Sequence, residues 1–153
     1  MAPPMDSPMS AKEPLRILVV DSDPSLRLLL VIPLQQHGWE VTTVADGEAA
    51  LEILQAGLPD VLLIDLILPK RSGREVLAWI DATNRSWLEH VIVLTAASHS
   101  VREDLQTIHP ISGIIRKPFD IADLANRIES CAKSVVFPRR EAQTANPRET
   151  VNP

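Results

Sequence analysis

Residues 61–65 read VLLID, four consecutive apolar side chains that end at Asp65. A short run that is apolar on both faces is typical of a parallel strand whose sheet is covered by helices on each side. The same form recurs at 17–20 (ILVV), at 91–94 (VIVL) and, more weakly, at 114–115 (II). Residues 41–44 (VTTV) are more polar, so we expect them to form an edge strand.

Helical patterns separate these five runs. A first helix is expected from about Pro24 to Gln36. Asp46 and Asp120 each stand where an N-cap precedes a helical apolar pattern. Ser72 and Ser100 each stand three residues before a glutamate, which is the spacing of a capping box.

Strand and helix patterns alternate along the whole of this region, which predicts an α/β fold with a parallel sheet. Right-handed crossovers then place helices on both faces. Five strands of this kind fit the flavodoxin-like doubly wound arrangement, with strand order 2-1-3-4-5. We predict one domain over residues 15–137. Residues 1–14 and 138–153 are rich in proline and polar side chains, so disordered tails are expected there.

Composition narrows the functional classes. The formal net charge is −5, and phosphate contacts need clustered Lys and Arg, so no nucleic-acid partner is expected. The single cysteine, Cys131, excludes an intrachain disulfide. No secretory signal is recognisable, and the longest apolar run (28–34) is interrupted by Pro33 and too short to span a bilayer. We therefore expect a cytoplasmic protein without a membrane partner.

Polar side chains follow four of the five predicted strands. These are Asp21, Asp65, Thr95 and Lys117. In an open α/β sheet the carboxyl ends of the strands form the site, so these residues are expected at one rim. Grouped carboxylates repel one another, and Mg²⁺ relieves that repulsion. Lysine and a hydroxyl can hold phosphoryl oxygens, and an aspartate can form an acyl phosphate.

Each of these residues has an ordinary structural explanation when taken alone. An aspartate after a strand is often a helix N-cap, and a lysine there is often only a solvated charge. Asp23, directly before Pro24, fits the N-cap interpretation well. The functional interpretation depends on the combination, because all four residues are of suitable types and all four stand at the correct strand ends.

The motifs at these positions resemble those of the response-regulator receiver family. They are ILVVD at 17–21, LIDLILP at 63–69 with Gly73 eight residues after Asp65, VLTA at 93–96, and KPF at 117–119. Their order and spacing agree with the family over nearly all of residues 16–132. In that family the Lys–Pro bond of the last motif is usually cis.

The resemblance implies a role for each residue of the site. Asp65 would be the phosphoacceptor of a two-component phosphorelay. Asp21, Asp65 and the backbone carbonyl of Ile67 would bind Mg²⁺. Thr95 would contact the phosphoryl group, and Lys117 would pair with it. The donor would be a phosphohistidine on a histidine kinase or a histidine phosphotransfer protein, and the chain would catalyse at most its own phosphorylation and dephosphorylation.

The resemblance also implies a surface for signalling through protein–protein contacts. In this family the partner face is usually formed by helix 4, strand 5 and helix 5. Residues 101–108 and 120–133 would contribute to that face here. Their apolar side chains have the alternative explanation that they belong to the core.

One departure concerns the metal. The family usually has two adjacent acids after its first strand, and here the second position is Ser22. A hydroxyl is a poorer Mg²⁺ ligand than a carboxylate, so we predict weak Mg²⁺ binding in which either Ser22 or Asp23 could take part.

The main alternative is a pseudo-receiver, an interaction module that is not phosphorylated. Ser22 favours it, and so does Ile114, which stands where the family usually has an aromatic switch residue. Retention of Asp65, Thr95 and Lys117 opposes it. A flavodoxin-like enzyme or electron carrier is a third possibility. The acidic residues at 21–23 oppose that one, because they would repel a cofactor phosphate. A DNA-binding regulator ranks fourth.

Overall fold

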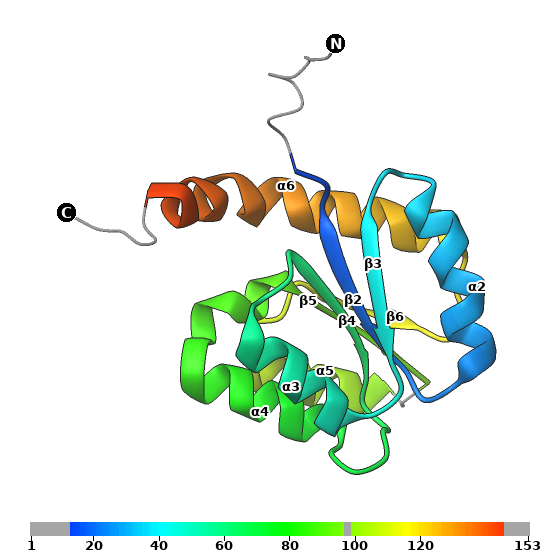
Figure 1. Cartoon of the computed structure of the whole chain (residues 1–153). Coiled ribbons are helices and arrows are strands. Elements are labelled where there is room, and N and C mark those ends of the chain that lie inside the picture. Colours follow the sequence, from blue (N-terminus) through cyan, green and yellow to red (C-terminus); the bar gives the residue numbers. More distant parts are fainter. Residues whose placement is uncertain (1–12, 97–98, 146–153) are drawn as a thin grey trace.

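The computed structural model describes residues 13–96 and 99–145 (Figure 1). The strands are β2 (Arg16–Val20), β3 (Glu40–Val44), β4 (Val61–Asp65), β5 (Val91–Thr95) and β6 (Gly113–Arg116). The helices are α2 (Pro24–Gln35), α3 (Gly47–Ala56), α4 (Gly73–Asn84), α5 (His99–Ile108) and α6 (Ile121–Ala145), with a 3-10 helix η1 (Arg85–His90) that the sequence did not predict.

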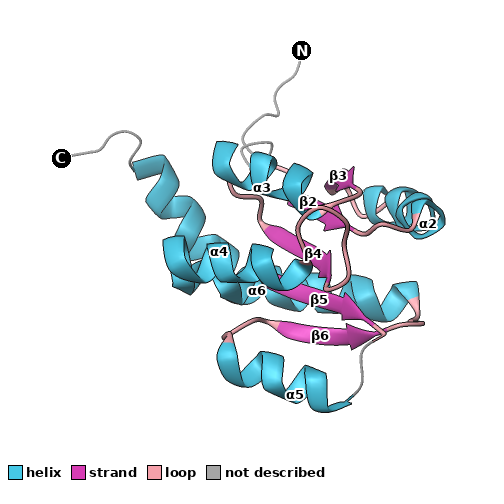
Figure 2. Ribbon diagram, turned by 90° about the horizontal axis from the view of Figure 1, so that it is seen from below, coloured by secondary structure: helices cyan, strands magenta, loops and turns pink. Residues whose placement is uncertain are grey.

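All strand pairs are parallel, and the order across the sheet is β3-β2-β4-β5-β6. Counted along the chain this is 2-1-3-4-5, so the predicted fold is confirmed, including β3 at one edge. Figure 2 shows the arrowheads of neighbouring strands pointing the same way. The register aligns the strand ends, since Val20 pairs with both Val44 and Ile64.

The two faces of the sheet have separate apolar cores. Helices α3, α4 and α5 cover one face, and α2 and α6 cover the other. Alternate residues of each strand point to opposite faces, as the pleat requires. In β4, for example, Leu62 and Ile64 enter the first core, whereas Val61 and Leu63 enter the second. The strand is buried on both sides, which explains why its first four residues are all apolar.

Four of the five predicted helix starts are confirmed, including the start of α2 at Pro24. The Asp46 carboxylate accepts a hydrogen bond from the Ala49 amide at 2.7 Å. Ser72 forms both bonds of the capping box that opens α4. Asp120 lies just before α6 and accepts from a first-turn amide. The prediction for Ser100 is wrong, because α5 already begins at His99. Capping-box spacing is a pattern of residue types, and it can also occur inside a first turn.

Helix α6 continues past the predicted domain end at residue 137 and includes Pro138. The predicted C-terminal tail therefore begins inside this helix. Proline in a helix interior costs about 3 kcal/mol but does not forbid the helix, and Pro33 likewise lies within α2. Residues 1–12 and 146–153 lie outside the described part, so the domain limits stay predictions. No helix in the described residues is both long and apolar enough to cross a membrane.

Candidate functional site

Three predicted site residues meet at the carboxyl edge of the sheet. Asp21 directly follows β2, Asp65 is the last residue of β4, and Lys117 directly follows β6. The Lys117 ammonium donates hydrogen bonds to Asp21 Oδ2 at 2.6 Å and to Asp65 Oδ2 at 2.7 Å. Residues separated by as many as 96 positions in the sequence therefore form one cluster.

The cluster is largely shielded from water. Asp21 is 1% exposed and Asp65 is 9% exposed, whereas the Lys117 side chain is 22% exposed. Partial burial of the ammonium disfavours its charge, but hydrogen bonds and charge attraction from both aspartates outweigh this and raise the pKa of Lys117 above its ordinary value. The lysine therefore stays charged at neutral pH and counters the repulsion between the two carboxylates.

The second oxygen of each carboxylate is held by its own loop. Asp21 Oδ1 accepts from the Asp23 amide at 2.9 Å, and Asp65 Oδ1 accepts from the Ile67 amide at 3.2 Å. Each carboxylate is thus fixed from two sides before any ligand arrives. Such preorganisation lowers the cost of placing charge at this point.

Thr95 lies on the strand between Asp65 and Lys117. It is the last residue of β5, is fully buried, and pairs with Arg116 in the sheet register. Its backbone carbonyl accepts from the Lys117 amide at 2.9 Å. The Lys117–Pro118 peptide bond is cis, as the resemblance implied.

The residues named as possible extra metal ligands lie at the surface. Ser22 and Asp23 are exposed, and Asp23 is the N-cap of α2 through a 2.9 Å bond from the Ser25 amide. For Asp23 the structural explanation therefore holds. The Ile67 side chain is 76% exposed, on the loop that follows Asp65.

The donor set can be tested against Mg²⁺. Among residues 13–96 and 99–145, no three side chains of the types His, Cys, Asp or Glu lie close enough together to hold a metal. Two carboxylates, Asp21 and Asp65, are present at the rim. Mg²⁺ is commonly bound through one or two carboxylates while it keeps water and phosphate oxygens as further ligands. The residues fit Mg²⁺, with fewer charged ligands than a three-acid site would supply.

Two structural residues next to the site were not singled out from the sequence. Arg27 on α2 donates to the Asp21 backbone carbonyl at 2.6 Å. Gly47 opens α3 beside the loop after Asp65: its amide donates to the Pro69 carbonyl at 3.3 Å, and a Cβ there would overlap the Arg71 backbone. The Asp-Gly pair before α3 was a weak signal for a close approach, but the Arg27 contact left no sequence signal at all.

The fold and the cluster define the class: a flavodoxin-like α/β protein with an acidic, lysine-bridged cluster at the carboxyl ends of its parallel strands. The chain belongs to the response regulator receiver domain family, whose model matches residues 17–129. This match confirms the family resemblance found in the sequence. Receiver domains are signalling modules of two-component systems.

Several relatives support this assignment. The DNA-binding response regulator MtrA of Mycolicibacterium smegmatis is 33% identical over 115 residues, which cover 75% of this chain and 49% of that protein. Protein Rrf1 of Nitratidesulfovibrio vulgaris is 33% identical over 108 residues, covering 70% of this chain and 75% of that protein. This chain spans about half the length of MtrA and of the similar transcriptional regulators that it matches.

Solved structures agree with the fold. A putative response regulator from Chloroflexus aurantiacus superposes with a TM-score of 0.72 at 26% identity, covering 79% of this chain and 99% of that one. The receiver domain of a sensor histidine kinase from Pseudomonas aeruginosa, with magnesium in its active-site cleft, gives a TM-score of 0.70 at 25% identity, covering 79% and 99%.

The comparisons also bear on two earlier expectations. MtrA is named as DNA-binding, so the expected absence of a nucleic-acid partner has no support among the relatives. The pseudo-receiver alternative gains no support either, because the matched proteins are named as response regulators and receiver domains.

Proposed function

We propose that this chain accepts a phosphoryl group from a phosphohistidine onto Asp65. The observation that carries the proposal is the Lys117 ammonium bridging the carboxylates of Asp21 and Asp65. The bridge puts a fixed cation beside a shielded nucleophilic carboxylate. That arrangement suits the transfer of an anionic group, because the cation can neutralise the charge that the phosphoryl group brings.

In the proposed reaction an Asp65 carboxylate oxygen forms a bond to phosphorus while the phosphorus–nitrogen bond to histidine breaks. The electron pair stays on the imidazole, which takes up a proton. Lys117 neutralises charge on the phosphoryl oxygens, and the Thr95 hydroxyl contacts one of them. Mg²⁺, held by Asp21, Asp65 and the Ile67 carbonyl, would supply further neutralising charge when bound.

The approach of a donor protein is supported by the surface next to the site. Helix α2 begins immediately after Asp21-Ser22-Asp23 and exposes three large apolar side chains, namely Leu28, Leu29 and Ile32. Ile67 adds a fourth beside Asp65. Neighbouring apolar side chains in water are typical of a contact surface, so we assign this side to the histidine kinase or phosphotransfer protein.

For signalling we propose the face formed by α5, β6 and α6. On this face Ile108 is exposed, whereas Leu105, Leu124 and Ile128 are buried and belong to the cores. A partner protein would therefore contact mainly polar residues and few apolar ones.

The test is intact-protein mass spectrometry after incubation with acetyl phosphate and Mg²⁺. Wild type should gain one phosphoryl mass, and Asp65→Asn should gain none, because an amide is a far poorer nucleophile than a carboxylate. No gain by wild type, repeated with a phosphorylated histidine donor, would favour the pseudo-receiver instead.

An acidic side chain at position 22, directly after Asp21, should strengthen metal binding. Ser22→Asp is expected to lower the Kd for Mg²⁺ by about tenfold, since it adds a carboxylate where the structure has an exposed hydroxyl. Isothermal titration calorimetry on both proteins checks this. Ser25→Asp, on the same helix start, is the matched control. An equal gain in both variants would mean that only net charge changed.

A further inference from the structure

The site has an unusual charge balance. Two carboxylates, Asp21 and Asp65, face one ammonium, Lys117, within hydrogen-bonding distance. Position 22, directly after Asp21, could carry a second acid, but it carries the neutral Ser22. These three groups together carry one net negative charge with which to attract a divalent cation.

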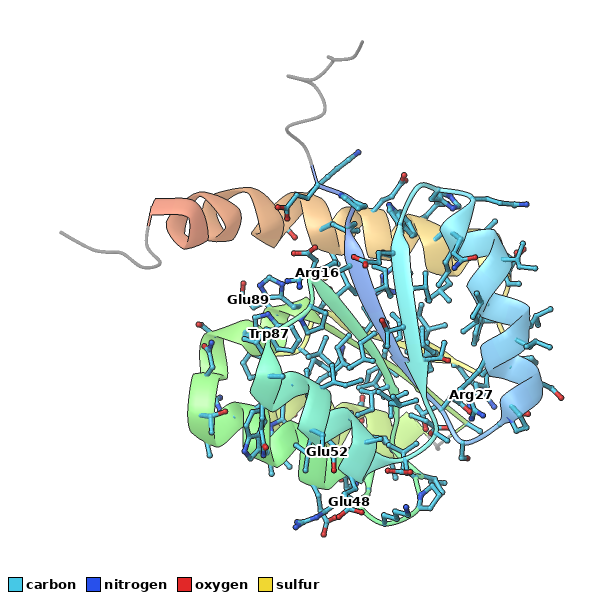
Figure 3. All side chains as sticks on the ribbon, in the orientation of Figure 1. Arg16, Arg27, Glu48, Glu52, Trp87 and Glu89 are labelled. Atoms are coloured by element: carbon cyan, nitrogen blue, oxygen red, sulfur yellow. The ribbon has the colours of Figure 1, made fainter. Side chains whose placement is uncertain are left out.

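A second cation lies against the backbone of Asp21. Arg27 lies one turn into α2, and its guanidinium donates to the Asp21 backbone carbonyl at 2.6 Å. Figure 3 labels Arg27 at the end of the molecule where β2 leads into α2. The side chain is partly buried, and among the described residues it forms no ion pair. Its positive charge is therefore fixed against the backbone of the acidic turn and is not cancelled by a carboxylate of its own.

We infer that Arg27 is a built-in cation beside the phosphoacceptor site and that it keeps the Mg²⁺ affinity of this site low. With Arg27 included, the two carboxylates are balanced by two positive charges. A divalent cation approaching Asp21 then meets the positive charge of a guanidinium bonded to the backbone of the same residue, and like charges repel one another in a partly shielded site. The inference rests on the proposed function, because it takes Asp21 and Asp65 as the Mg²⁺ ligands.

The competing explanation is that Arg27 only holds the turn of residues 21–23 in place. The two explanations predict different changes in Mg²⁺ affinity when Arg27 is replaced. If Arg27 only supports the turn, its removal loosens Asp21 and weakens Mg²⁺ binding or leaves it unchanged. If its charge matters, a neutral side chain that can still donate a hydrogen bond tightens Mg²⁺ binding. Arg27→Gln supplies such a side chain, and Arg27→Lys keeps the charge.

The experiment is calorimetric titration of the full chain with Mg²⁺ in the absence of any phosphodonor. Arg27→Gln should lower the Kd for Mg²⁺ by about three- to tenfold, as expected for losing one like charge near the ion. Arg27→Lys should stay within about twofold of wild type. The same two substitutions are also made in a Ser22→Asp protein, where Mg²⁺ binding is expected to be stronger. Each should change the Kd for Mg²⁺ by the same factor there as in the wild-type chain. Thermal melting of each variant checks that it is folded.

A Kd that stays the same or rises in Arg27→Gln overturns the inference, and so does an equal tightening in Arg27→Lys. Absence of measurable Mg²⁺ binding in all variants, Ser22→Asp included, overturns it as well. These outcomes are separate from the fate of the proposed function, because phosphoryl incorporation at Asp65 is measured in a different assay. Phosphorylation can succeed while the Arg27 inference fails, and the reverse is also possible.

Discussion

Replacing Lys117 with methionine is expected to slow phosphoryl transfer to Asp65 by about 10²- to 10³-fold, the usual cost of removing one preorganised electrostatic contact. The ammonium lies 2.7 Å from Asp65 Oδ2 and 2.6 Å from Asp21 Oδ2. No other cation is bonded to both carboxylates in the described residues. Methionine keeps the length and much of the apolar stem, so the change removes mainly the charge and its hydrogen bonds.

The same substitution leaves two shielded carboxylates facing each other, so the free energy of unfolding should fall as well. Breaking a fully buried ion pair costs about 3–5 kcal/mol; with Lys117 22% exposed, about 1–3 kcal/mol is expected. Initial rates of mass gain with acetyl phosphate give the first effect, and urea unfolding gives the second. Lys133→Met, on the exposed surface of α6, is the control. A rate within twofold of wild type would remove Lys117 from the proposed mechanism.

Gly73→Ala should lower the free energy of unfolding by about 3 kcal/mol or more. A Cβ at this position would overlap the Asp65 backbone oxygen and lie 2.6 Å from Leu66 Cα. Both neighbours are main chain, so neither can move aside without shifting the end of β4. The Gly73 amide also donates to the Leu66 carbonyl at 2.8 Å, which would be strained by the same shift.

Urea denaturation measures this loss, with Gly57→Ala as the matched control. A Cβ at Gly57 meets nothing within 4 Å, and its backbone is extended, so the control should change stability by no more than about 0.5 kcal/mol. If Gly73→Ala were as stable as the control, the close approach between the start of α4 and the end of β4 would have to be wrong.

Much of the fold could be predicted because several independent signals agreed. The runs around Leu18, Leu63 and Ile92 are apolar on both faces, which only a sheet with helices on each side requires. Asp46 and Ser72 had the side chains that cap helices, and they do cap them. The meeting of Asp21, Asp65 and Lys117 could also be expected, since parallel strands end at one edge of a sheet.

The remainder depends on contacts that leave no local pattern. The bond from Arg27 to a backbone carbonyl is set by how α2 lies against the end of β2, and any arginine on a helix looks the same in sequence. The fit of Gly47 against the Arg71 backbone depends on the path of a loop from another part of the chain. The C-terminal tail was predicted to begin at Pro138, but helix α6 continues through this residue, because one lost backbone donor is not enough to end a helix.

The most direct test of the central claim is to locate the phosphoryl group. After incubation with acetyl phosphate and Mg²⁺, reduction with borohydride converts an aspartyl phosphate to homoserine, and peptide mass spectrometry finds the altered residue. We expect homoserine at position 65 in the peptide that carries LIDLILP, and none at Asp21 or Asp23. Homoserine at another aspartate, or at no position after the incubation, would contradict the account.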